Sequence, residues 1–225
     1  MNSLEVCCGD LQAVIEAAKG GAVRVELCSA LSLDGLTPSA GLIAAARKVV
    51  GPRLHVLIRP REGNFIYTPE EFDVMRQDIL TARQLGADGV VIGALTPEGD
   101  IDVEPLRQLM HAAEGMQVTF HRAFDYCRDP HEALRQIIAL GCSRLLTSGQ
   151  QATAEAGIPL LRQLVNDAGE KIIIMPGAGV NERNASLILQ QTGAHEIHSS
   201  CRSRLTADAP LITNAQQVRN IINCL

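Results

Sequence analysis

Residues 117–141, QVTFHRAFDYCRDPHEALRQIIALG, contain one complete strand-and-helix unit. The short run Gln117–Arg122 is typical of a β-strand. Asp129 stands where a helix N-cap belongs, and Pro130 follows it at the first helical position, where a missing backbone N–H costs nothing. Gly141 ends the helical pattern, at the usual place of a left-handed C-cap. The segment therefore predicts a strand followed by a helix.

The same unit repeats along the chain without interruption. Neighbouring predicted strands begin about 20–35 residues apart, which is the length of one strand–helix unit in a parallel sheet. The eight predicted strands are Leu4–Cys8, Val23–Cys28, Leu54–Arg59, Gly89–Ala94, Gln117–Arg122, Arg144–Ser148, Lys171–Met175 and Glu196–Ser199.

Start and stop signals for helices lie between these strands. The predicted N-caps are Asp10, Thr37, Thr68, Asp102 and Asp129. A glycine falls in each of the seven joints between a helix and the next strand. These glycines are Gly20, Gly51, Gly86, Gly115, Gly141, Gly169 and Gly193.

Alternating strands and helices predict a parallel sheet. Eight units within 225 residues favour closure into a (β/α)₈ barrel of the TIM type, as a single domain spanning residues 1–225. The alternative is an open, doubly wound sheet. It is disfavoured because no G-x-G-x-x-G turn follows the first strand.

Composition narrows the function classes. The net charge is -5, and no long Lys/Arg run is present, so we expect neither nucleic acid nor an anionic membrane as a partner. Aromatic residues make up only 3%, which argues against base-stacking platforms. The seven cysteines are scattered and form no C-x-x-C pair. With no signal-like N-terminus and no apolar run of about 20 residues, we expect a cytoplasmic protein with reduced thiols.

Side-chain parity along the strands separates two faces, because side chains alternate with period two. The face toward the helices must be apolar, so the polar set is predicted to point into the barrel. Arg24 is predicted to be a buried ion-pair partner of Glu5 or Glu196, and His55 to have a similar structural role. The predicted interior residues are Glu5, Glu26, Arg59, His121 and His198, whereas Val25, Ile58, Phe120 and Ile197 are predicted to face helices.

Specific motifs surround these positions, above all RVELC at Arg24–Cys28 and TFHRAFD at Thr119–Asp125. With them the sequence resembles the CutC family of copper homeostasis proteins. The resemblance implies a TIM-type barrel, a cytoplasmic location, often a homodimer, and a role in copper handling. The family usually has glycine where Asp34 and Glu62 stand, and the segment Arg202–Pro210 is shorter here than is common. The matching motifs are LEVCC (Leu4–Cys8), RVELC (Arg24–Cys28), DGLTPS (Asp34–Ser39), IRPREGNFIY (Ile58–Tyr67), TFHRAFD (Thr119–Asp125), LLTSGQ (Leu145–Gln150), PGAGV (Pro176–Val180) and IHSSCR (Ile197–Arg202).

The copper role leads to a metal hypothesis. Cys7 and Cys28 occupy corresponding places in neighbouring predicted strands, on the interior face. Cu(I) is a soft ion that selects thiolates, so the two sulfurs could hold it together, with help from His121 or His198. The alternative is that each cysteine is an ordinary small buried hydrophobe.

An enzyme is the second hypothesis, and it uses other residues. Glu26 and His121 could serve as general base and acid, with His198, Arg59, Arg122 and Asp125 around them. The chemistry that suits this set is proton transfer, or lyase or hydrolase chemistry, on a small anionic metabolite. Asp125 could equally be a salt-bridge partner of Arg122.

Two turns extend the enzyme hypothesis to an anion site. PGAGV follows the seventh predicted strand, and two serines follow or end the eighth, where barrels often bind phosphate. The glycines could equally form only a tight turn. A pure interaction scaffold is the third hypothesis, but it would need no polar groups inside the barrel. The predicted anion-binding residues are Gly177, Gly179, Ser199 and Ser200.

Overall fold

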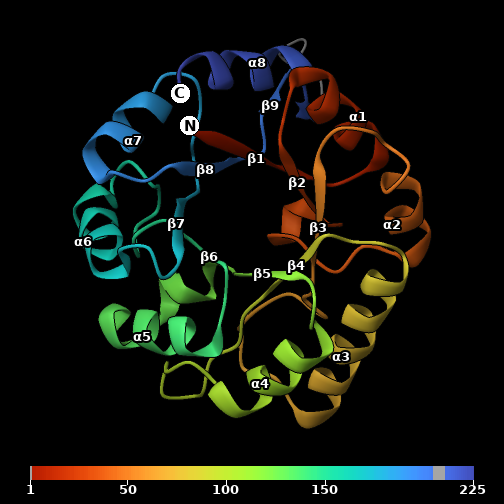
Figure 1. Cartoon of the computed structure of the whole chain (residues 1–225), viewed down its shortest axis with the longest axis vertical. Coiled ribbons are helices and arrows are strands. Elements are labelled where there is room, and N and C mark those ends of the chain that lie inside the picture. Colours follow the sequence, from red (N-terminus) through yellow and green to blue (C-terminus); the bar gives the residue numbers. More distant parts are fainter. Residues whose placement is uncertain (1, 205–210) are drawn as a thin grey trace.

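Eight parallel strands form a nearly closed barrel surrounded by eight helices (Figure 1). The computed structural model describes residues 2–204 and 211–225. This architecture confirms the predicted TIM-type barrel, with modest differences at the strand ends. The barrel strands are β1 (Ser3–Cys8), β2 (Arg24–Leu27), β3 (Arg53–Leu57), β4 (Gly89–Ile92), β5 (Gln117–Phe120), β6 (Arg144–Thr147), β7 (Ile173–Pro176) and β8 (Glu196–Ser199).

The helices alternate with the strands and form the outer ring seen in Figure 1. Two short 3₁₀ helices, η1 (Leu31–Leu33) and η2 (Arg122–Tyr126), follow β2 and β5 at the strands' carboxyl ends. The α-helices are α1 (Leu11–Gly20), α2 (Ala40–Ala46), α3 (Pro69–Gln84), α4 (Val103–Ala112), α5 (Pro130–Leu140), α6 (Ile158–Ala168), α7 (Ala185–Thr192) and α8 (Ala215–Asn223).

Backbone ladders join the strands in the order β7-β6-β5-β4-β3-β2-β1-β8. In the described part of the chain no ladder joins β7 to β8, but the two sides of this seam are in contact. A Cβ atom on Gly177 would lie 3.3 Å from the His198 Cβ atom, and the Ser199 hydroxyl donates to the Val180 carbonyl at 2.7 Å. The sheet therefore curls round to meet itself, and the open-sheet alternative is wrong.

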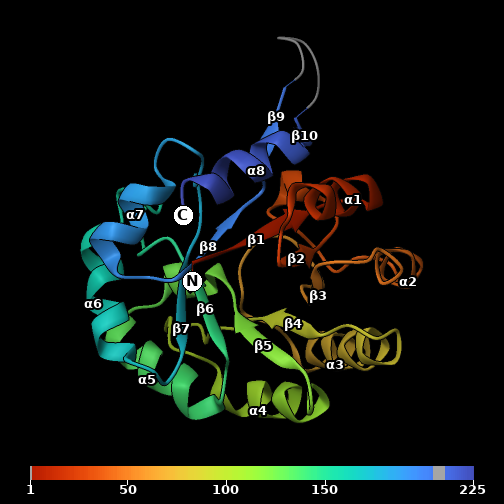
Figure 2. The ribbon, with the colours of Figure 1, turned by 45° about the horizontal axis from the view of Figure 1, so that its top comes forward.

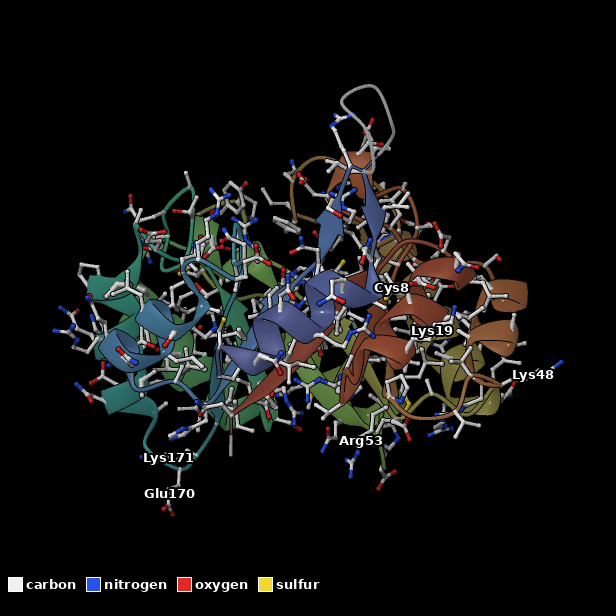
Figure 3. The ribbon with its side chains drawn as sticks, turned by 90° about the horizontal axis from the view of Figure 1, so that it is seen from above. Cys8, Lys19, Lys48, Arg53, Glu170 and Lys171 are labelled. Carbon is white, nitrogen blue, oxygen red and sulfur yellow. The ribbon has the colours of Figure 1, made fainter. Side chains whose placement is uncertain are left out.

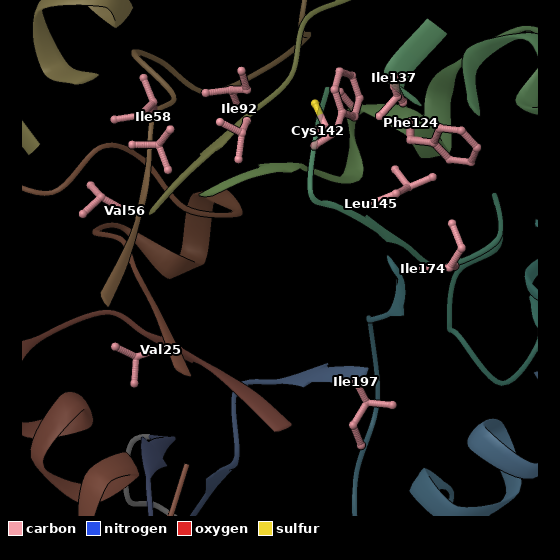
Figure 4. Packing of buried hydrophobic residues seen from close by; sticks show 14 of the residues in the cluster. Val25, Val56, Ile58, Ile92, Phe124, Ile137, Cys142, Leu145, Ile174 and Ile197 are labelled. Atoms are coloured by element: carbon pink, nitrogen blue, oxygen red, sulfur yellow. The ribbon is translucent and has the colours of Figure 1, made fainter. Parts of the chain in front are cut away.

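The two predicted faces of the strands are confirmed. The apolar face packs against the helices, and Figure 4 shows Val25, Ile58 and Ile197 in this layer. Phe120 belongs to the same core and is fully buried. The polar face fills the barrel interior, where Glu5 and His55 have no exposed surface. Because the helix ring excludes water from one face, the charged residues have only the interior face available.

Local signals account for most helix starts. The Asp10 side chain accepts from the Ala13 amide, Asp129 accepts from two amides, and Thr68 forms a capping box with Glu71. The predicted cap at Thr37 is wrong, because α2 begins after Ser39.

The Thr37 side chain instead hydrogen-bonds to the backbone of Arg59. Its hydroxyl accepts from the Arg59 amide at 2.9 Å and donates to the Arg59 carbonyl at 3.2 Å. Asp102 stands at the predicted cap position of α4, but its side chain makes no capping bond. In the first helix-to-strand joint the left-handed residue is Gly21 rather than Gly20, which ends α1.

The two ends of the barrel differ. After β8 a small antiparallel pair, β9 (Arg202–Ser203) and β10 (Ile212–Thr213), projects beyond the helices (Figure 2). Figure 3 shows Arg53, Glu170 and Lys171 at the opposite end, where strands begin. Of the segment predicted to be short, Arg202–Pro210, residues 205–210 lie outside the described part. Among the helices that the structure describes, none has the length and apolar character to cross a membrane.

Candidate functional site

A cavity of about 280 Å³ opens at the carboxyl ends of the strands. Most of the residues singled out in the sequence meet there, because parallel strands all end at the same rim of the barrel. Neither Asp125 nor Gly177 lines the cavity. The predicted residues that do are Cys7, Glu26, Cys28, Arg59, His121, Arg122, Gly179, His198, Ser199 and Ser200.

Cys7 and Cys28 face each other on the cavity wall. Their Sγ atoms are 3.6 Å apart, and both side chains are buried. In register Cys7 lies opposite Glu26, so Cys28 stands just beyond the end of the β1–β2 ladder, where its amide donates to the Cys8 carbonyl. The hydrogen bond with Cys28, burial and the Glu26 charge together raise the pKa of the Cys7 thiol well above its usual value. Cys7 is therefore protonated in the absence of a metal.

His198 joins this pair from β8. Its Nδ1 atom lies 2.9 Å from Glu5 Oε1, and its Nε2 atom lies 3.5 Å from Glu26 Oε2. Burial alone would lower the pKa of His198, but the interactions with Cys7, Glu5 and Glu26 raise it well above its usual value. The ring is thus an imidazolium between two carboxylates.

Glu26 is held in the same cluster. Burial raises the pKa of this carboxyl group, and the nearby Glu5 charge adds to the effect, against the attraction of His198. A metal ion could be held by three of these side chains. The Cys7 sulfur, a Glu26 carboxylate oxygen and a His198 ring nitrogen all lie within 4.8 Å of one another.

Deeper in the barrel, an ion-pair network supports the cavity floor. Arg24 forms salt bridges with both Glu5 and Glu196, which confirms its predicted structural role. Arg144 adds a second cation on Glu196, 2.8 Å away. Burial opposes ionisation of Glu5, but Arg24 and His198 prevail and hold its pKa well below the usual value. His55 contacts Glu5 at 4.0 Å, and burial lowers its pKa to about 4.

Arg59 and His121 occupy the opposite wall. The Arg59 guanidinium donates from its Nη atoms to the carbonyls of Leu33, Gly35 and Gly63, at 2.8–3.0 Å. His121 Nδ1 accepts from the Ala123 amide at 3.1 Å. Burial, reinforced by the Arg59 charge, lowers the pKa of His121 to about 3, so its ring is neutral at physiological pH.

Arg122 and Asp125 have different positions. The Arg122 side chain is 40% exposed at the cavity rim and pairs with Asp125 at 2.8 Å. Asp125 also accepts from the hydroxyl of Thr147 and from the amide and hydroxyl of Ser148. These bonds tie η2 to the end of β6. The structure therefore places Asp125 in the role of a salt-bridge partner, away from the cavity.

The predicted anion site is partly assembled. Gly179, Ser199 and Ser200 line the cavity, but the Gly177 amide already donates to the Thr147 carbonyl. The Ser199 hydroxyl is also engaged, by the Val180 carbonyl and the Cys201 amide. Within residues 2–204 and 211–225 we find no acceptor for the amides of Gly179 and Val180.

Two glycines that the sequence analysis did not use make room for the histidines. A Cβ atom on Gly93 would lie 2.5 Å from His121 Cε1, and one on Gly89 would lie 2.6 Å from His55 Nε2. The sequence held a signal for these glycines. Gly89, Val91 and Gly93 are alternate residues of the predicted strand Gly89–Ala94, so they share one face of it. Phe65 was also missed: its ring packs against His121, with centroids 5.0 Å apart, and under the Arg59 guanidinium at 5.1 Å.

Comparisons with known proteins agree with this architecture. The CutC family model matches residues 2–203. A CutC family protein of Bacteroides thetaiotaomicron is 54% identical over 205 residues, which cover 91% of this chain and 82% of that protein. One from Pasteurella multocida is 48% identical over 96% of this chain and 89% of its own length.

A solved structure from Streptococcus agalactiae, whose name assigns it to copper homeostasis as a CutC protein, superimposes with a TM-score of 0.86. It is 37% identical, and the match covers 89% of this chain and 99% of that one. The family match extends over nearly the whole chain and includes Cys7, Glu26 and His198 on their strands and Cys28 directly after β2. The chain therefore belongs to the CutC family.

Proposed function

We propose that this protein is a cytoplasmic copper homeostasis protein that holds Cu(I) between Cys7 and Cys28 at the carboxyl ends of β1 and β2. The observation that carries the proposal is the 3.6 Å separation of the two sulfur atoms inside a cavity. The names of the CutC relatives point the same way. The seven cysteines are all free thiols, as a metal-binding role requires of this pair.

The two sulfurs fit one soft ion without movement of the strands. Metal–thiolate bonds of about 2.3 Å let two sulfurs up to about 4.6 Å apart share an ion. A separation of 3.6 Å lies well inside that limit. Because it is too short for two opposed bonds, the pair favours a bent arrangement that leaves room for a further ligand.

His198 is suited to supply that further ligand once metal binding displaces the proton from its Nε2 atom. Its Nδ1 atom is engaged by Glu5, which leaves Nε2 facing the cluster of Cys7 and Glu26. A carboxylate behind a ligating histidine fixes the ring and increases its basicity. Glu5 occupies that supporting position, and Arg24 in turn holds Glu5.

The experiment is a competition titration of Cu(I) against a chromophoric chelator under anaerobic conditions. Cys7→Ser and Cys28→Ser should each weaken Cu(I) binding by more than about 100-fold. Substituting a residue that only hydrogen-bonds to a metal ligand typically has a smaller effect, of about 10–100-fold. Cys142→Ser is the matched control, because Cys142 is equally buried but belongs to the apolar core outside the barrel interior. Equal affinity in all four proteins would remove this pair from the copper site.

A second candidate, an acid–base enzyme acting on a small anionic metabolite, is favoured by one observation. Glu26, Arg59 and His121 line the same cavity, with room for a small molecule between them. The raised pKa of Glu26 suits a general base. His121, being neutral, would act by donating a hydrogen bond from Nε2 rather than as an imidazolium acid. A metabolite screen on the native protein and on Glu26→Gln tests this, since turnover that survives unchanged excludes Glu26.

The same candidate includes an anion site between Gly179 and Ser200, beside the unpaired amides of Gly179 and Val180. Inorganic phosphate should raise the melting temperature and perturb these amides in NMR spectra. No change in either would count against the site.

A further inference from the structure

Two buried hydrogen-bond donors on the cavity wall have no acceptor. They are Arg59 Nε and His121 Nε2, and neither finds a partner within the described part of the chain. Arg59 is 4% exposed and His121 is 5% exposed. Buried polar groups in native proteins are nearly always paired, so two unpaired donors on one wall call for a partner from outside the chain.

The bonds that these groups do make determine what is left over. His121 Nδ1 accepts from the Ala123 amide, so the neutral ring carries its proton on Nε2. Arg59 uses its Nη atoms on three loop carbonyls, which fix the guanidinium. The Tyr67 hydroxyl lies beside the guanidinium, but the Nε–H has no acceptor at hydrogen-bond geometry. Both remaining groups are donors, and therefore they select a ligand made of acceptors.

The two groups are neighbours. The Phe65 ring contacts both, and the Arg59 charge acts on the His121 ring. Both donor atoms are buried, and Phe65 is packed on both residues, so a ligand reaches the donors only when this local packing opens. Phe65 lies on the loop between β3 and α3 and is itself partly exposed, which makes this motion local.

We propose that the cavity binds a small organic carboxylate, whose oxygens accept from Arg59 Nε–H and His121 Nε2–H. A carboxylate offers acceptors only, and a hydrogen bond to a guanidinium is among the stronger ones. The rest of the wall suits the carbon skeleton, because Leu31, Leu57 and Leu146 line the same cavity. The volume of about 280 Å³ limits the ligand to a small metabolite.

This inference rests on the second candidate function and names its ligand class. The two donors share the cavity with Cys7 and Cys28 but are not the proposed copper ligands, so carboxylate binding does not require the metal. The experiment therefore uses protein that has been freed of metal with a chelator and then dialysed to remove the chelator. Acetate and malonate are titrated at constant ionic strength, with inorganic phosphate as a third probe. Binding is followed by calorimetry and by the ring-nitrogen NMR signals of the histidines.

The expected result is binding of acetate or malonate with a shift of the His121 Nε2–H signal. His121→Leu should lose at least about tenfold in affinity, as expected when a hydrogen bond to a charged group is removed. His121→Gln, which keeps an N–H donor on a side chain of similar reach, should retain most of it. His55→Leu is the matched control, because His55 is also buried with unpaired nitrogens but does not line the cavity.

Three results would overturn the proposal. One is carboxylate binding that is equally tight in His121→Leu. Another is native protein in which neither carboxylate moves the His121 signal, a measurement that stays decisive even where His121→Leu does not fold. The third is binding of phosphate alone, which would assign the anion to the Gly179 turn. None of these depends on whether Cu(I) binds Cys7 and Cys28.

Discussion

Glu5 shows how single charges are tolerated inside the barrel. This fully buried carboxylate has Arg24 on one side and His198 on the other. An isolated charge there would be prohibitively costly, but paired charges that are also hydrogen-bonded offset the loss of water. Glu5 therefore links the structural network of the floor to the histidine of the proposed metal site.

We predict that Glu5→Gln lowers the free energy of unfolding by about 3–5 kcal/mol at neutral pH, because it leaves Arg24 with one partner fewer in a buried place. The pKa of Glu5 is lowered on folding, so its stabilisation is present above its ordinary pKa of 4.5 and is lost as the pH falls through the folded value. The deficit of the variant should thus be constant from pH 6 to 8 and shrink below about pH 4.5.

Urea unfolding across this pH range measures the effect. Glu104→Gln is the control, because Glu104 is 80% exposed in its ion pair with Arg107 and should contribute little. A Glu5→Gln variant as stable as the native protein at pH 7 would contradict the role given to the network.

At the scale of single residues, the sequence predicted which side chains point into the barrel, because alternation along a strand is enough to decide this. Period-two alternation placed Glu5, Glu26 and His198 inside, and they are inside. Alternation could not show that His121 Nδ1 accepts a hydrogen bond from the Ala123 amide. Nor could it show that Asp125 accepts hydrogen bonds from the hydroxyls of Thr147 and Ser148. Those bonds depend on how loops from different units meet, which no local pattern encodes.

At the scale of the element, β4 and the residue that follows it make room for the histidines of the neighbouring strands. Gly89 and Gly93 stand opposite His55 and His121, where any side chain would collide with an imidazole ring. Gly89 and Val91 are hydrogen-bonded into the ladders of β3 and β5 in regular register. Neither Gly89 nor Gly93 has a positive φ, so these glycines provide space rather than an unusual backbone conformation.

We predict that Gly93→Ala destabilises the protein by about 1–3 kcal/mol, the usual cost of overpacking a tight interior. The added methyl group would press on His121 and on Ala123, whose Cβ atom is 3.2 Å away. The same change should weaken binding of acetate, because it displaces the ring that offers Nε2–H.

Gly41→Ala is the matched control on the outer ring. A Cβ atom there meets only the Ser39 hydroxyl, at 3.9 Å, within the helix α2. Because alanine favours helix over glycine, this variant should be about 0.5–1 kcal/mol more stable than the native protein. Thermal unfolding of both variants tests the pair, and a neutral Gly93→Ala would show that His121 has more freedom than its packing indicates.

Elements were predictable from the chain because their signals are local. Asp129, Pro130 and Gly141 mark α5 as the structure has it. The N-cap predicted at Thr37 was wrong for a reason that depends on the tertiary structure. The Thr37 hydroxyl hydrogen-bonds to the Arg59 backbone, and Ser39, two residues later, is the N-cap of α2.

For the molecule as a whole, closure of the barrel is what brings the site together. Cys7 and Cys28 are neighbours because β1 pairs with β2, and His198 joins them because β8 pairs with β1. Eight repeated units predict this closure. The family resemblance, rather than the repeat, supplied the expectation of copper.

The resemblance also implies a homodimer, and we predict one in solution. Leu211, next to β10, and Ile212, in β10, are among the exposed apolar side chains available for a contact between copies. Sedimentation velocity should give a particle of twice the chain mass of 24.1 kDa. A single species of the chain mass at micromolar concentration would refute this.

X-ray absorption at the copper edge tests the central claim most directly. Protein loaded with one equivalent of Cu(I) should show two sulfur neighbours at about 2.2–2.3 Å, close to the usual metal–thiolate length. The sulfur signal should vanish in the Cys7→Ser, Cys28→Ser double variant and persist in Cys142→Ser. A first shell of only nitrogen and oxygen in the native protein, or sulfur retained in the double variant, would contradict copper binding by this pair.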